Sequence, residues 1–514
     1  MLDLGRTFLQ SVERRPDRLA IVDGGVRLTY EQWLDRIARA AGALCALGLE
    51  RGEHLVVVLQ NRWEMATLHW ACQFRGVIVT PLNWRAKADE VEYCVADAAA
   101  RAIVFEPVSA EAVMQSAACK AIPRIAVGGA ASRHPGATHT FEQLLECTPP
   151  ARLCAASAED VSLMLYTSGT TGRPKGVPRR HRVERAAAMA QVAQYRYSVG
   201  EVALGVMPLY HTMGVRSLLS TAIVDGALVC LPRFDAADAL RLIAAEKVSN
   251  LFLVPTLYHD LLAHADFANT DISSVRTIGF AGAPMNDDLL KRLAVAFKPN
   301  LFVNHYGSSE IYTFTIDQDA PAKPGSAGRA GYNCRIRVVK LDAGDDKSGP
   351  GALAARGEEG QIIADLGGDE AFEGYWNRPD ADRQALRDGW YFTGDIGYID
   401  ADGDLFVTGR VDDMIISGGE NISPADIESV LSLHPAVDEV AVAGLPDERW
   451  GQKVVAFIKV KVPVDAGALD RHCRSSTLPD YKRPREYVFV QTVPKSPVGK
   501  ILRRKLVAGE FDKA

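Results

Sequence analysis

The feature that most limits the fold of this chain is the alternation of strand-like and helix-like segments over its first 260 residues. The run HLVVVL at 54–59, a helical pattern at 63–74 and the run GVIVTPL at 76–82 follow each other as strand, helix and strand. The stripe of Leu34, Ile37, Ala41 and Leu44 predicts an amphipathic helix, which Thr29 and Gln32 begin with the spacing of a capping box. Such alternation is typical of parallel sheets covered by helices.

Later strand-like runs end directly in glycine or proline turns. These runs are VSLMLYT (161–167), GALVCLP (226–232), NLFLVP (250–255) and VRTIGFAG (275–282). Open α/β sheets bind ligands at the carboxyl ends of their strands. We therefore expect a site in the loops after VSLML, NLFLV and VRTIGF.

From about residue 335 the segments become shorter and β-rich, and after Arg410 a polar, glycine-rich span, VDDMIISGGENISP, follows at 411–424. A helix is expected from Ser423 as N-cap and Pro424 at the first helical position. We predict an α/β protein with a large N-terminal domain at 1–410 and a small, mobile α+β domain at 411–514. The large domain should hold parallel-rich sheets flanked by helices, with a small β subdomain at about 325–410.

Composition excludes several classes of protein. A formal charge of −6 over 514 residues gives no general basic face for nucleic acid. No apolar run approaches the length of a membrane span, and the N-terminus lacks a signal-peptide core, so we expect a soluble, cytoplasmic protein. The nine cysteines are scattered without a CxxC pair, which indicates reduced thiols and neither a disulfide framework nor a zinc site.

Residues 166–176, YTSGTTGRPKG, form a glycine-rich loop after the run VSLML. One interpretation is an ordinary turn with solvent-facing hydroxyls. The other is a phosphate cradle, in which glycines let backbone N–H groups approach an anion. The loop is not a Walker A motif, because Lys175 follows Pro174 and precedes Gly176.

Three further stretches are each ambiguous on their own. In NHYGSSE (304–310), Glu310 is placed either in a polar loop or as an oxygen ligand for Mg²⁺. In GWYFTGDIG (389–397), Asp395 forms either an Asx-type turn or a contact with ribose hydroxyls. The basic tail PKSPVGKILRRK (494–505) is by default a solvated face.

The order of the motifs resolves this ambiguity. YTSGTTGRPKG, PLYHTMG, GFAGAP, YGSSE, GWYFTGD, GRVDDMIISGGENISP and PVGK together resemble the acyl-adenylate-forming (AMP-binding) enzymes over nearly the whole chain. That superfamily includes acyl- and aryl-coenzyme A ligases, peptide-synthetase adenylation domains and firefly-type luciferases. GRVDDMIISGGENI, ERWGQ and YKRPREY followed by PVGKILRR look most like the bacterial 4-chlorobenzoate and benzoate type coenzyme A ligases.

The resemblance implies two half-reactions and three cofactors: ATP, Mg²⁺ and coenzyme A. A carboxylate attacks the α-phosphorus of MgATP to give acyl-AMP and pyrophosphate, and the thiol of coenzyme A then displaces AMP. It also implies roles on the nucleotide side for residues at matching positions. The phosphates would contact Thr167, Ser168, Gly169, Thr170, Thr171, Gly172 and Lys175, as well as Ser309, where the family more often has threonine. The adenine would meet Ala283, Pro284 and Tyr306, the ribose Asp395 and Arg410, and the metal Glu310.

Other matching positions belong to catalysis and to coenzyme A. Lys500 would be the adenylation lysine and Asp412 the hinge between the two half-reactions. The pantetheine arm would pass Gly418, Gly419, Glu420 and Trp450. The nucleotide end of coenzyme A would meet Arg85, Tyr481, Arg483 and Arg485, whose alternative is that they are solvated surface residues.

The acyl pocket is expected around PLYHTMG, NLFLVP, FAGA and YGSSEIYT. His211 would gate it and contact the acid, and wall positions would be Thr212, Met213, Phe252, Gly282, His305 and Tyr312. His305 replaces the apolar residue that chlorobenzoate-type enzymes tend to have before the YG tyrosine, which puts a purely apolar ring substituent in doubt. We expect a benzoate-class acid, with hydroxylated and amino-substituted rings among the options and short or medium aliphatic or alicyclic acids as alternatives.

The expected partner is a small carboxylic acid, not a nucleic acid, and the oligomeric state, a homodimer included, stays open. One rival function is an adenylating enzyme that loads a carrier protein. Others are a non-catalytic nucleotide-binding regulator and a luciferase-like oxidative enzyme. The presence of Glu310, Asp395, Arg410 and Lys500 argues against the regulator.

Overall fold

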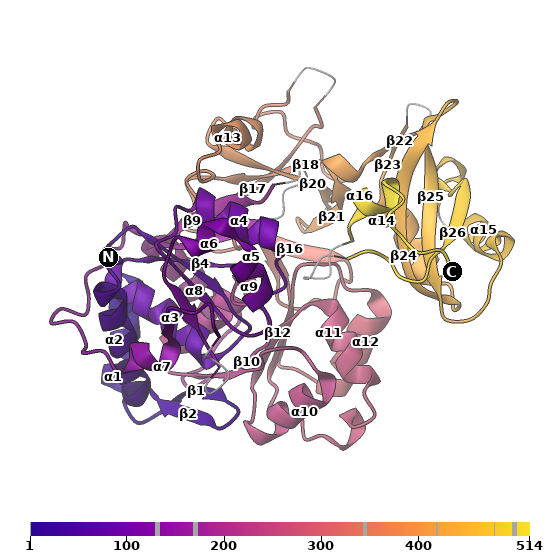
Figure 1. Ribbon diagram of the computed structural model, residues 1–514. Coiled ribbons are helices and arrows are strands. Elements are labelled where there is room, and N and C mark those ends of the chain that lie inside the picture. Colours follow the sequence, from indigo (N-terminus) through magenta and orange to yellow (C-terminus); the bar gives the residue numbers. More distant parts are fainter. Residues whose placement is uncertain are drawn as a thin grey trace.

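The computed structural model describes residues 2–128, 134–167, 173–342, 347–417, 420–476, 478–495 and 501–514. These residues form a large N-terminal α/β part with two sheets and a small C-terminal part with a third sheet, which confirms the predicted fold class (Figure 1).

The first sheet has seven strands in the order β7-β6-β5-β3-β4-β8-β9. All neighbours are parallel except the last pair, β8 and β9, which form an antiparallel hairpin. The bounds are β3 (His54–Val58), β4 (Ile78–Pro81), β5 (Ala102–Phe105), β6 (Arg124–Ala126), β7 (His139–Thr140), β8 (Val161–Thr167) and β9 (Lys175–Arg180).

The second sheet has fourteen strands in the order β17-β18-β20-β21-β16-β15-β14-β13-β12-β10-β11-β1-β2, with β19 beside β20. Its parallel centre is β11 (Ala227–Cys230), β10 (Val202–Gly205), β12 (Asn250–Leu253), β13 (Thr277–Phe280) and β14 (Leu301–Tyr306), extended on one side by β1 (Leu19–Asp23) and β2 (Val26–Thr29). On the other side are β15 (Thr315–Asp317), β16 (Ser326–Ala330), β17 (Ile336–Val339), β18 (Gly360–Asp365), β19 (Leu386–Arg387), β20 (Trp390–Ile399) and β21 (Leu405–Arg410). The β-rich segment therefore continues the large sheet in antiparallel fashion.

Helices separate and cover these two sheets (Figure 1). Helix α8 contacts β8 and β9 of the first sheet and packs on α9, which contacts β10, β11 and β12 of the second. The helices of the large part are α1 (Leu4–Arg14), α2 (Tyr30–Ala46), α3 (Trp63–Arg75), α4 (Ala88–Asp97), α5 (Ala110–Gln115), α6 (Ala117–Lys120), α7 (Phe141–Leu145), α8 (His181–Gln194), α9 (Thr212–Ile223), α10 (Ala236–Ala245), α11 (Pro255–Ala263), α12 (Asp287–Phe297) and α13 (Pro379–Ala385). Helix α2 begins with the predicted capping box, since Thr29 and Gln32 exchange both hydrogen bonds.

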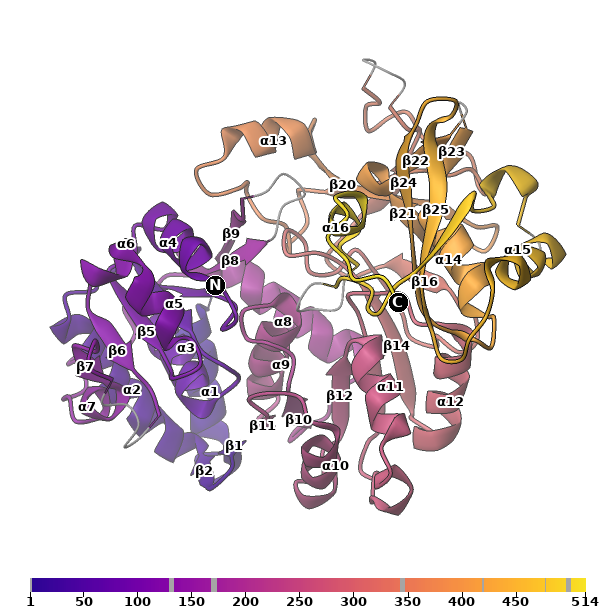
Figure 2. The ribbon, with the colours of Figure 1, turned by 45° about the vertical axis from the view of Figure 1, so that its right-hand side comes forward.

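The C-terminal part has its own sheet and its own buried apolar cluster. Strands β22 (Ile415–Ser417), β23 (Glu420–Ile422), β24 (Val437–Asp447), β25 (Gly451–Val460) and β26 (Glu486–Phe489) are accompanied by α14 (Pro424–Ser432), α15 (Ala466–Ser475) and α16 (Arg503–Val507). Figure 2 shows this sheet standing apart from the seven-stranded sheet, on the side of β20 and β21. A 3₁₀ turn at Val411–Asp413 joins the two parts.

Two polar contacts fix the ends of this junction. Ser423 precedes Pro424 as expected, but its hydroxyl does not cap α14 and donates instead to the carbonyl of Thr408 on β21. The prediction of Ser423 as N-cap and Pro424 at the first helical position is confirmed, although the hydroxyl finds its backbone acceptor in the other part of the chain. Arg503 donates to Asp413 over 3.0 Å and to both carboxylate oxygens of Glu428, so Asp413 belongs to the C-terminal part.

Candidate functional site

Predicted residues from distant segments meet at the carboxyl end of β14. The hydroxyl of Tyr306, the last residue of this strand, donates to Asp395 on β20. Asp395 pairs across the ladder with Arg410 on β21, and the two side chains form an ion pair of 2.6 Å. Burial of Tyr306 and the adjacent Asp395 carboxylate raise the pKa of Tyr306 well above its usual value. Tyr306, Asp395 and Arg410 therefore form one connected group.

Gly394 makes room for this ion pair. Its φ is +76°, a conformation that glycine adopts without strain, and a Cβ there would lie 2.9 Å from Nη2 of Arg410. Burial opposes the charge of Arg410, but the Asp395 carboxylate prevails and raises the pKa of Arg410. The guanidinium therefore stays charged beside the one carboxylate of this group.

Glu310 lies four residues beyond Tyr306 and is buried. One of its carboxylate oxygens accepts from the hydroxyl of Tyr375 over 2.7 Å, and among the described residues the other oxygen has no hydrogen-bond donor. Nζ of Lys175 lies 4.3 Å from the centre of the Tyr375 ring. A carboxylate oxygen without a protein donor suits Mg²⁺, which commonly takes one or two carboxylates and shares substrate phosphates.

Arg179 is a residue that the sequence did not single out. Its side chain is fully buried, and Nη1 donates to the carbonyls of Glu310 and Glu370, each over 2.8 Å. Nε donates to Glu184 over 2.8 Å, and the guanidinium carbon lies 3.9 Å from the centre of the Tyr312 ring. Arg179 thus joins the β8–β9 hairpin to the loop that carries Glu310. In KGVPRRHR it looks like one more surface charge, and no local signal distinguishes it.

The predicted acyl residues surround the start of α9. His211 is the N-cap of this helix, and its Nδ1 accepts from the backbone N–H of Met213 over 3.4 Å. Thr212 and Met213 are buried, and Gly282 follows β13 with a φ of +83°. His211 and Gly282 lie in the connections that follow β10 and β13, and Thr212 and Met213 form the first turn of α9, at the end of the strands where such sheets bind ligands.

Three further acyl positions belong to the large sheet: Phe252 in β12, His305 in β14 and Tyr312 in the connection from β14 to β15. The rings of Phe252 and His305 are 5.6 Å apart, and both side chains are buried. Tyr312 is buried as well and donates to Glu184 over 3.2 Å. Burial and the charge of Glu184 raise the pKa of Tyr312 well above its usual value, so its hydroxyl remains a donor.

The predicted coenzyme A positions do not form one group among the described residues. Arg485 lies on the ring of Trp450, 5.3 Å from its centre, together with Arg449 at 4.8 Å. Arg483 instead forms ion pairs with Asp470 and Asp480. Glu420 and Tyr481 are exposed, and Arg85 lies in the N-terminal part, stacked on Trp84 at 3.6 Å.

The remaining predicted positions are partly outside the described residues. Thr167 and Lys175 face each other across the β8–β9 hairpin, the carbonyl of Ser309 lies 3.4 Å from Nη1 of Arg179, and Asp412 is exposed in the junction turn. Ala283 and Pro284 form the loop after β13, with Pro284 exposed. Ser168, Gly169, Thr170, Thr171, Gly172, Gly418, Gly419 and Lys500 lie outside the described residues.

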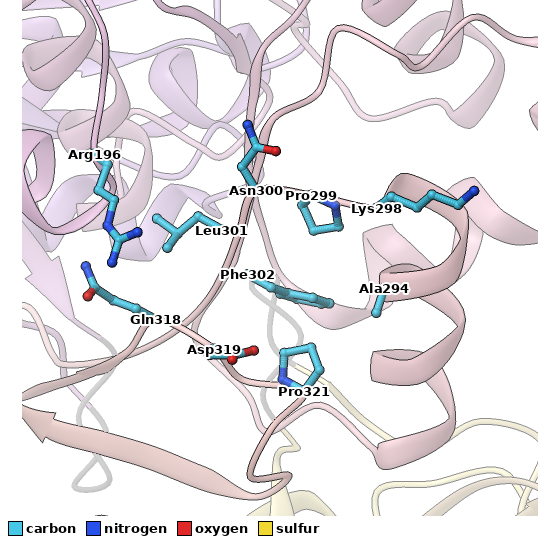
Figure 3. A pocket seen from close by; sticks show the side chains of 10 residues that line it. All are labelled: Arg196, Ala294, Lys298, Pro299, Asn300, Leu301, Phe302, Gln318, Asp319 and Pro321. Atoms are coloured by element: carbon cyan, nitrogen blue, oxygen red, sulfur yellow. The ribbon is translucent and has the colours of Figure 1, made fainter.

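A surface pocket of about 560 Å³ lies at the opposite, amino-terminal end of β14. In Figure 3, Arg196 points toward Gln318 on one side, and Phe302, Ala294 and Pro321 gather on the other. This pocket is separated from Tyr306 by the length of the strand. It contains none of the predicted site residues.

An acidic cluster on the β20–β21 connection is neutralised by a lysine. Asp400, Asp402 and Asp404 are the one group in the described ranges with the spacing of a metal site, and Nζ of Lys323 lies 2.5 to 2.8 Å from a carboxylate oxygen of each. The ammonium takes the place that a cation would occupy. In the part of the chain that the structure describes, no helix is long and apolar enough to cross a membrane.

Comparison with known proteins identifies the family. Residues 8–376 match the AMP-binding enzyme family and residues 426–500 the AMP-binding enzyme C-terminal domain. The chain belongs to the AMP-binding enzymes. It is an AMP-forming acid–coenzyme A ligase, and its cofactors are ATP, Mg²⁺ and coenzyme A.

The relatives act on different acids. The chain is 33% identical to a 4-chlorobenzoate–CoA ligase of Arthrobacter sp., over 96% of this chain and 93% of that protein. It is also 33% identical to the long-chain-fatty-acid–CoA ligase FadD13 of Mycobacterium tuberculosis, over 98% of both chains. Among solved structures, ATP-bound MatB from Rhodopseudomonas palustris has a TM-score of 0.87 at 26% identity and covers 99% of both chains. The predicted family is confirmed, and these names leave the acid of this chain open.

Proposed function

We propose that this protein joins a benzoate-class carboxylic acid to coenzyme A, through an acyl-AMP, with release of AMP and pyrophosphate. The observation that carries the proposal is the arrangement of β14. Neighbouring residues of a strand point to opposite faces of the sheet. Tyr306 contacts Asp395 on one face, and His305 contacts the ring of Phe252 on the other. The nucleotide and the acid would then meet at the end of a single strand.

On the nucleotide side, the Asp395 carboxylate would accept hydrogen bonds from ribose hydroxyls while Arg410 holds it in place. Tyr306, Ala283 and Pro284 would contact the adenine. The Tyr306 hydroxyl is engaged by Asp395, which fixes the plane of its ring. A preorganised contact of this kind orients the nucleotide at little cost in free energy on binding.

On the phosphate side, Glu310 would hold Mg²⁺, which supplies positive charge that neutralises the phosphate oxygens. The chain's own part is to hold the Glu310 carboxylate in position, through the Tyr375 hydroxyl and through Arg179 on the Glu310 carbonyl. The loop of Thr167 to Gly172, Ser309 and Lys175 would donate to the β- and γ-phosphates.

The C-terminal part would act in both half-reactions. Lys500 would stabilise the charge that develops between the carboxylate and the α-phosphorus. Rotation at Asp412 would then bring Gly418, Gly419, Glu420 and Trp450 to the thiol arm, with Arg85, Tyr481, Arg483 and Arg485 toward the coenzyme nucleotide. We propose residues 1–410 and 411–514 as the two bodies, which agrees with the place of the junction turn at Val411–Asp413.

On the acid side, His211, Thr212, Met213 and Gly282 would line the entrance of the slot, and Phe252, His305 and Tyr312 its interior. Phe252, His305 and Tyr312 have aromatic or imidazole rings that are almost fully buried. Flat rings favour a flat substrate through offset and edge contacts. These features support a benzoate-class acid over an extended alkyl chain.

The test is a panel of acids incubated with MgATP and coenzyme A, in which AMP release and thioester mass are both measured. The expected result is AMP and thioester with substituted benzoates and little of either with long-chain fatty acids. Acyl-AMP without thioester for every acid would favour the rival function of loading a carrier protein. Absence of AMP with every acid would refute the proposed function.

A further inference from the structure

Four buried polar side chains lie together behind the predicted acyl residues: Tyr195, Arg216, His305 and Thr313, here called the polar cluster. Tyr195 is the C-cap of α8, Arg216 lies in α9, His305 in β14, and Thr313 in the connection to β15. None is more than 3% exposed. Only His305 was named from the sequence: Thr313 ends the stretch YGSSEIYT but was not singled out, and Tyr195 and Arg216 lie outside the motifs.

Arg216 is the centre of this cluster. Its Nη1 lies 2.9 Å from the hydroxyl of Thr313 and 3.1 Å from Nε2 of His305, and Nη2 donates to the carbonyl of Ala187 over 3.3 Å. Its Nε is buried without a hydrogen-bond partner. Among the described residues no carboxylate lies within ion-pair distance of the guanidinium, and the carboxylate of Glu184 acts on it only from farther away. A buried N–H without an acceptor is costly unless a ligand supplies one.

The hydrogen bonds of His305 show that the cluster offers donors. Its Nε2 lies 3.1 Å from both Arg216 and the carbonyl of Tyr312, and a neutral ring cannot accept from one and donate to the other at the same nitrogen. If Nε2 donates to Tyr312, Nδ1 accepts from the Tyr195 hydroxyl, 3.4 Å away. If Nε2 accepts from Arg216, Nδ1 carries the ring proton and donates to the Tyr195 oxygen, so the Tyr195 hydroxyl proton has no acceptor on His305. In both cases Nε–H of Arg216 remains free.

The ring of His305 is neutral in either arrangement. Burial, and then the neighbouring Arg216 charge, lower the pKa of His305 well below its usual value. Protonation would place two cations 3.1 Å apart in the interior. The positive charge of the cluster therefore stays on Arg216.

In the proposed acyl slot, the polar cluster would close the inner end. Phe252 pairs with Gly279 on the neighbouring strand, so their side-chain positions share one face of the sheet. A Cβ on Gly279 would lie 2.5 Å from the Tyr195 ring, which shows that this ring fills the space the glycine leaves. The Tyr195 ring lies 5.5 Å from Phe252 and 6.0 Å from His305. An acid that lies against Phe252 and His305, as proposed, would meet the Tyr195 ring there, which argues against an extended alkyl chain.

We propose that Arg216 is a specificity-determining residue, and that the polar cluster binds an oxygen acceptor at the end of the acid remote from the reacting carboxylate. A ring hydroxyl, a carbonyl or a second carboxylate provides such an oxygen. An amino substituent mainly offers N–H donors, whereas the cluster already contains an unpaired donor, the Nε–H of Arg216. A hydroxyl substituent is therefore preferred over an amino substituent. The inference rests on the proposed function and narrows its substrate class.

The first test uses the wild-type enzyme and needs no variant. The kcat/KM for AMP release is compared at each ring position between hydroxybenzoate, aminobenzoate and toluate, with phthalate isomers as the dicarboxylates. For the best position, the oxygen-bearing acid should exceed its amino and methyl counterparts by at least about tenfold, as expected for a bond to a charged donor. Equal or lower values for all oxygen-bearing acids would overturn the inference.

The second test assigns the preference to Arg216. The ratio of kcat/KM for the oxygen-bearing acid to kcat/KM for its methyl counterpart should fall toward one in R216M. In R216K, which keeps the charge but loses the Nε donor, the same ratio should fall by at least about threefold. Ser220→Ala is the matched control, because that buried hydroxyl on the same helix donates to the Arg216 backbone carbonyl and not to its guanidinium, and the ratio in this variant should equal that of the wild type.

The outcomes separate the two proposals. An unchanged ratio in either folded Arg216 variant would overturn the role of Arg216, and the R216K result decides alone if R216M does not fold. AMP formation without an oxygen preference in the wild type overturns this inference and leaves the proposed function standing. Absence of AMP with every acid would overturn both.

Discussion

Replacement of Arg179 by methionine should destabilise the large N-terminal part strongly. The change removes a fully buried cation. It also removes the hydrogen bonds that Arg179 donates to the Glu184 carboxylate and to the carbonyls of Glu310 and Glu370. Breaking a buried ion pair by removing one partner costs about 3 to 5 kcal/mol. With an unfolding entropy of roughly 2.1 cal/mol/K per residue over about 400 residues, this corresponds to a fall in Tm of about 4 to 6 °C.

Calorimetry of wild type, R179M, R179M/E184Q and R182M measures this effect. The double variant removes the uncompensated charge and keeps an acceptor for Tyr312, so it should recover about 1 to 3 °C relative to R179M. Arg182 is the control, since its ion pairs with Glu159 and Glu373 are on the surface, and R182M should shift Tm by less than about 1 °C. A shift below about 1 °C in R179M, or a further loss of stability in the double variant, would refute the reasoning.

The loss of stability in R179M should also depend on pH, and the titration of Glu184 determines the direction. Burial raises the pKa of Glu184, and Arg179 counteracts this, so the pKa rises further in R179M. A raised pKa in the folded state favours the protonated form. The contribution of Glu184 to stability is therefore fully present at pH values below its pKa in the unfolded chain. It is lost as the pH rises through its pKa in the folded protein. The difference in Tm between wild type and R179M should therefore widen from about pH 5 to about pH 8; a gap that narrows would contradict the assignment.

Three further predictions concern the reaction. Lys500→Ala should slow adenylation by on the order of 10²-fold or more and spare thioester formation from preformed acyl-AMP, as single-turnover assays of each half-reaction would show; equal losses would contradict the assignment. Asp412→Pro fixes φ at the junction and should impair thioester formation at least about tenfold while adenylation persists, which the same assays measure. Tyr375→Phe removes the donor to Glu310 and should raise the Mg²⁺ concentration for half-maximal adenylation about three- to tenfold with a smaller change in kcat, and an unchanged Mg²⁺ dependence would argue against Glu310 as the ligand.

The sequence predicts the architecture well because hydrophobic alternation is a local signal. The runs at 54–59, 161–167 and 275–282 each contain a strand in the structure, and the capping box of Thr29 and Gln32 forms as expected. Motif residues such as Tyr306, Asp395 and Arg410 meet because Tyr306 and Arg410 end strands of one sheet and Asp395 lies within β20, paired with Arg410.

Other features depend on contacts between segments far apart in the chain. Arg179 and Arg216 reach carbonyls or side chains up to 191 and 97 residues away, and each looks like an ordinary charge within its own segment. Ser423 has the position of a helix cap, yet its hydroxyl bonds to Thr408 in the other part of the chain. Tertiary partners of this kind override local preferences and cannot be inferred from spacing.

The alternation of side chains on β14 also bears on how this enzyme can change. Because His305 and Tyr306 face opposite sides of one strand, the proposed roles imply that a substitution at 305 would alter the choice of acid and leave the proposed adenosine contact of Tyr306 in place. An insertion or deletion of one residue within Leu301–Tyr306 would exchange the two faces and disable both at once. Substrate range can therefore diverge readily by point mutation here, whereas the length of this strand should be nearly invariant among functional descendants.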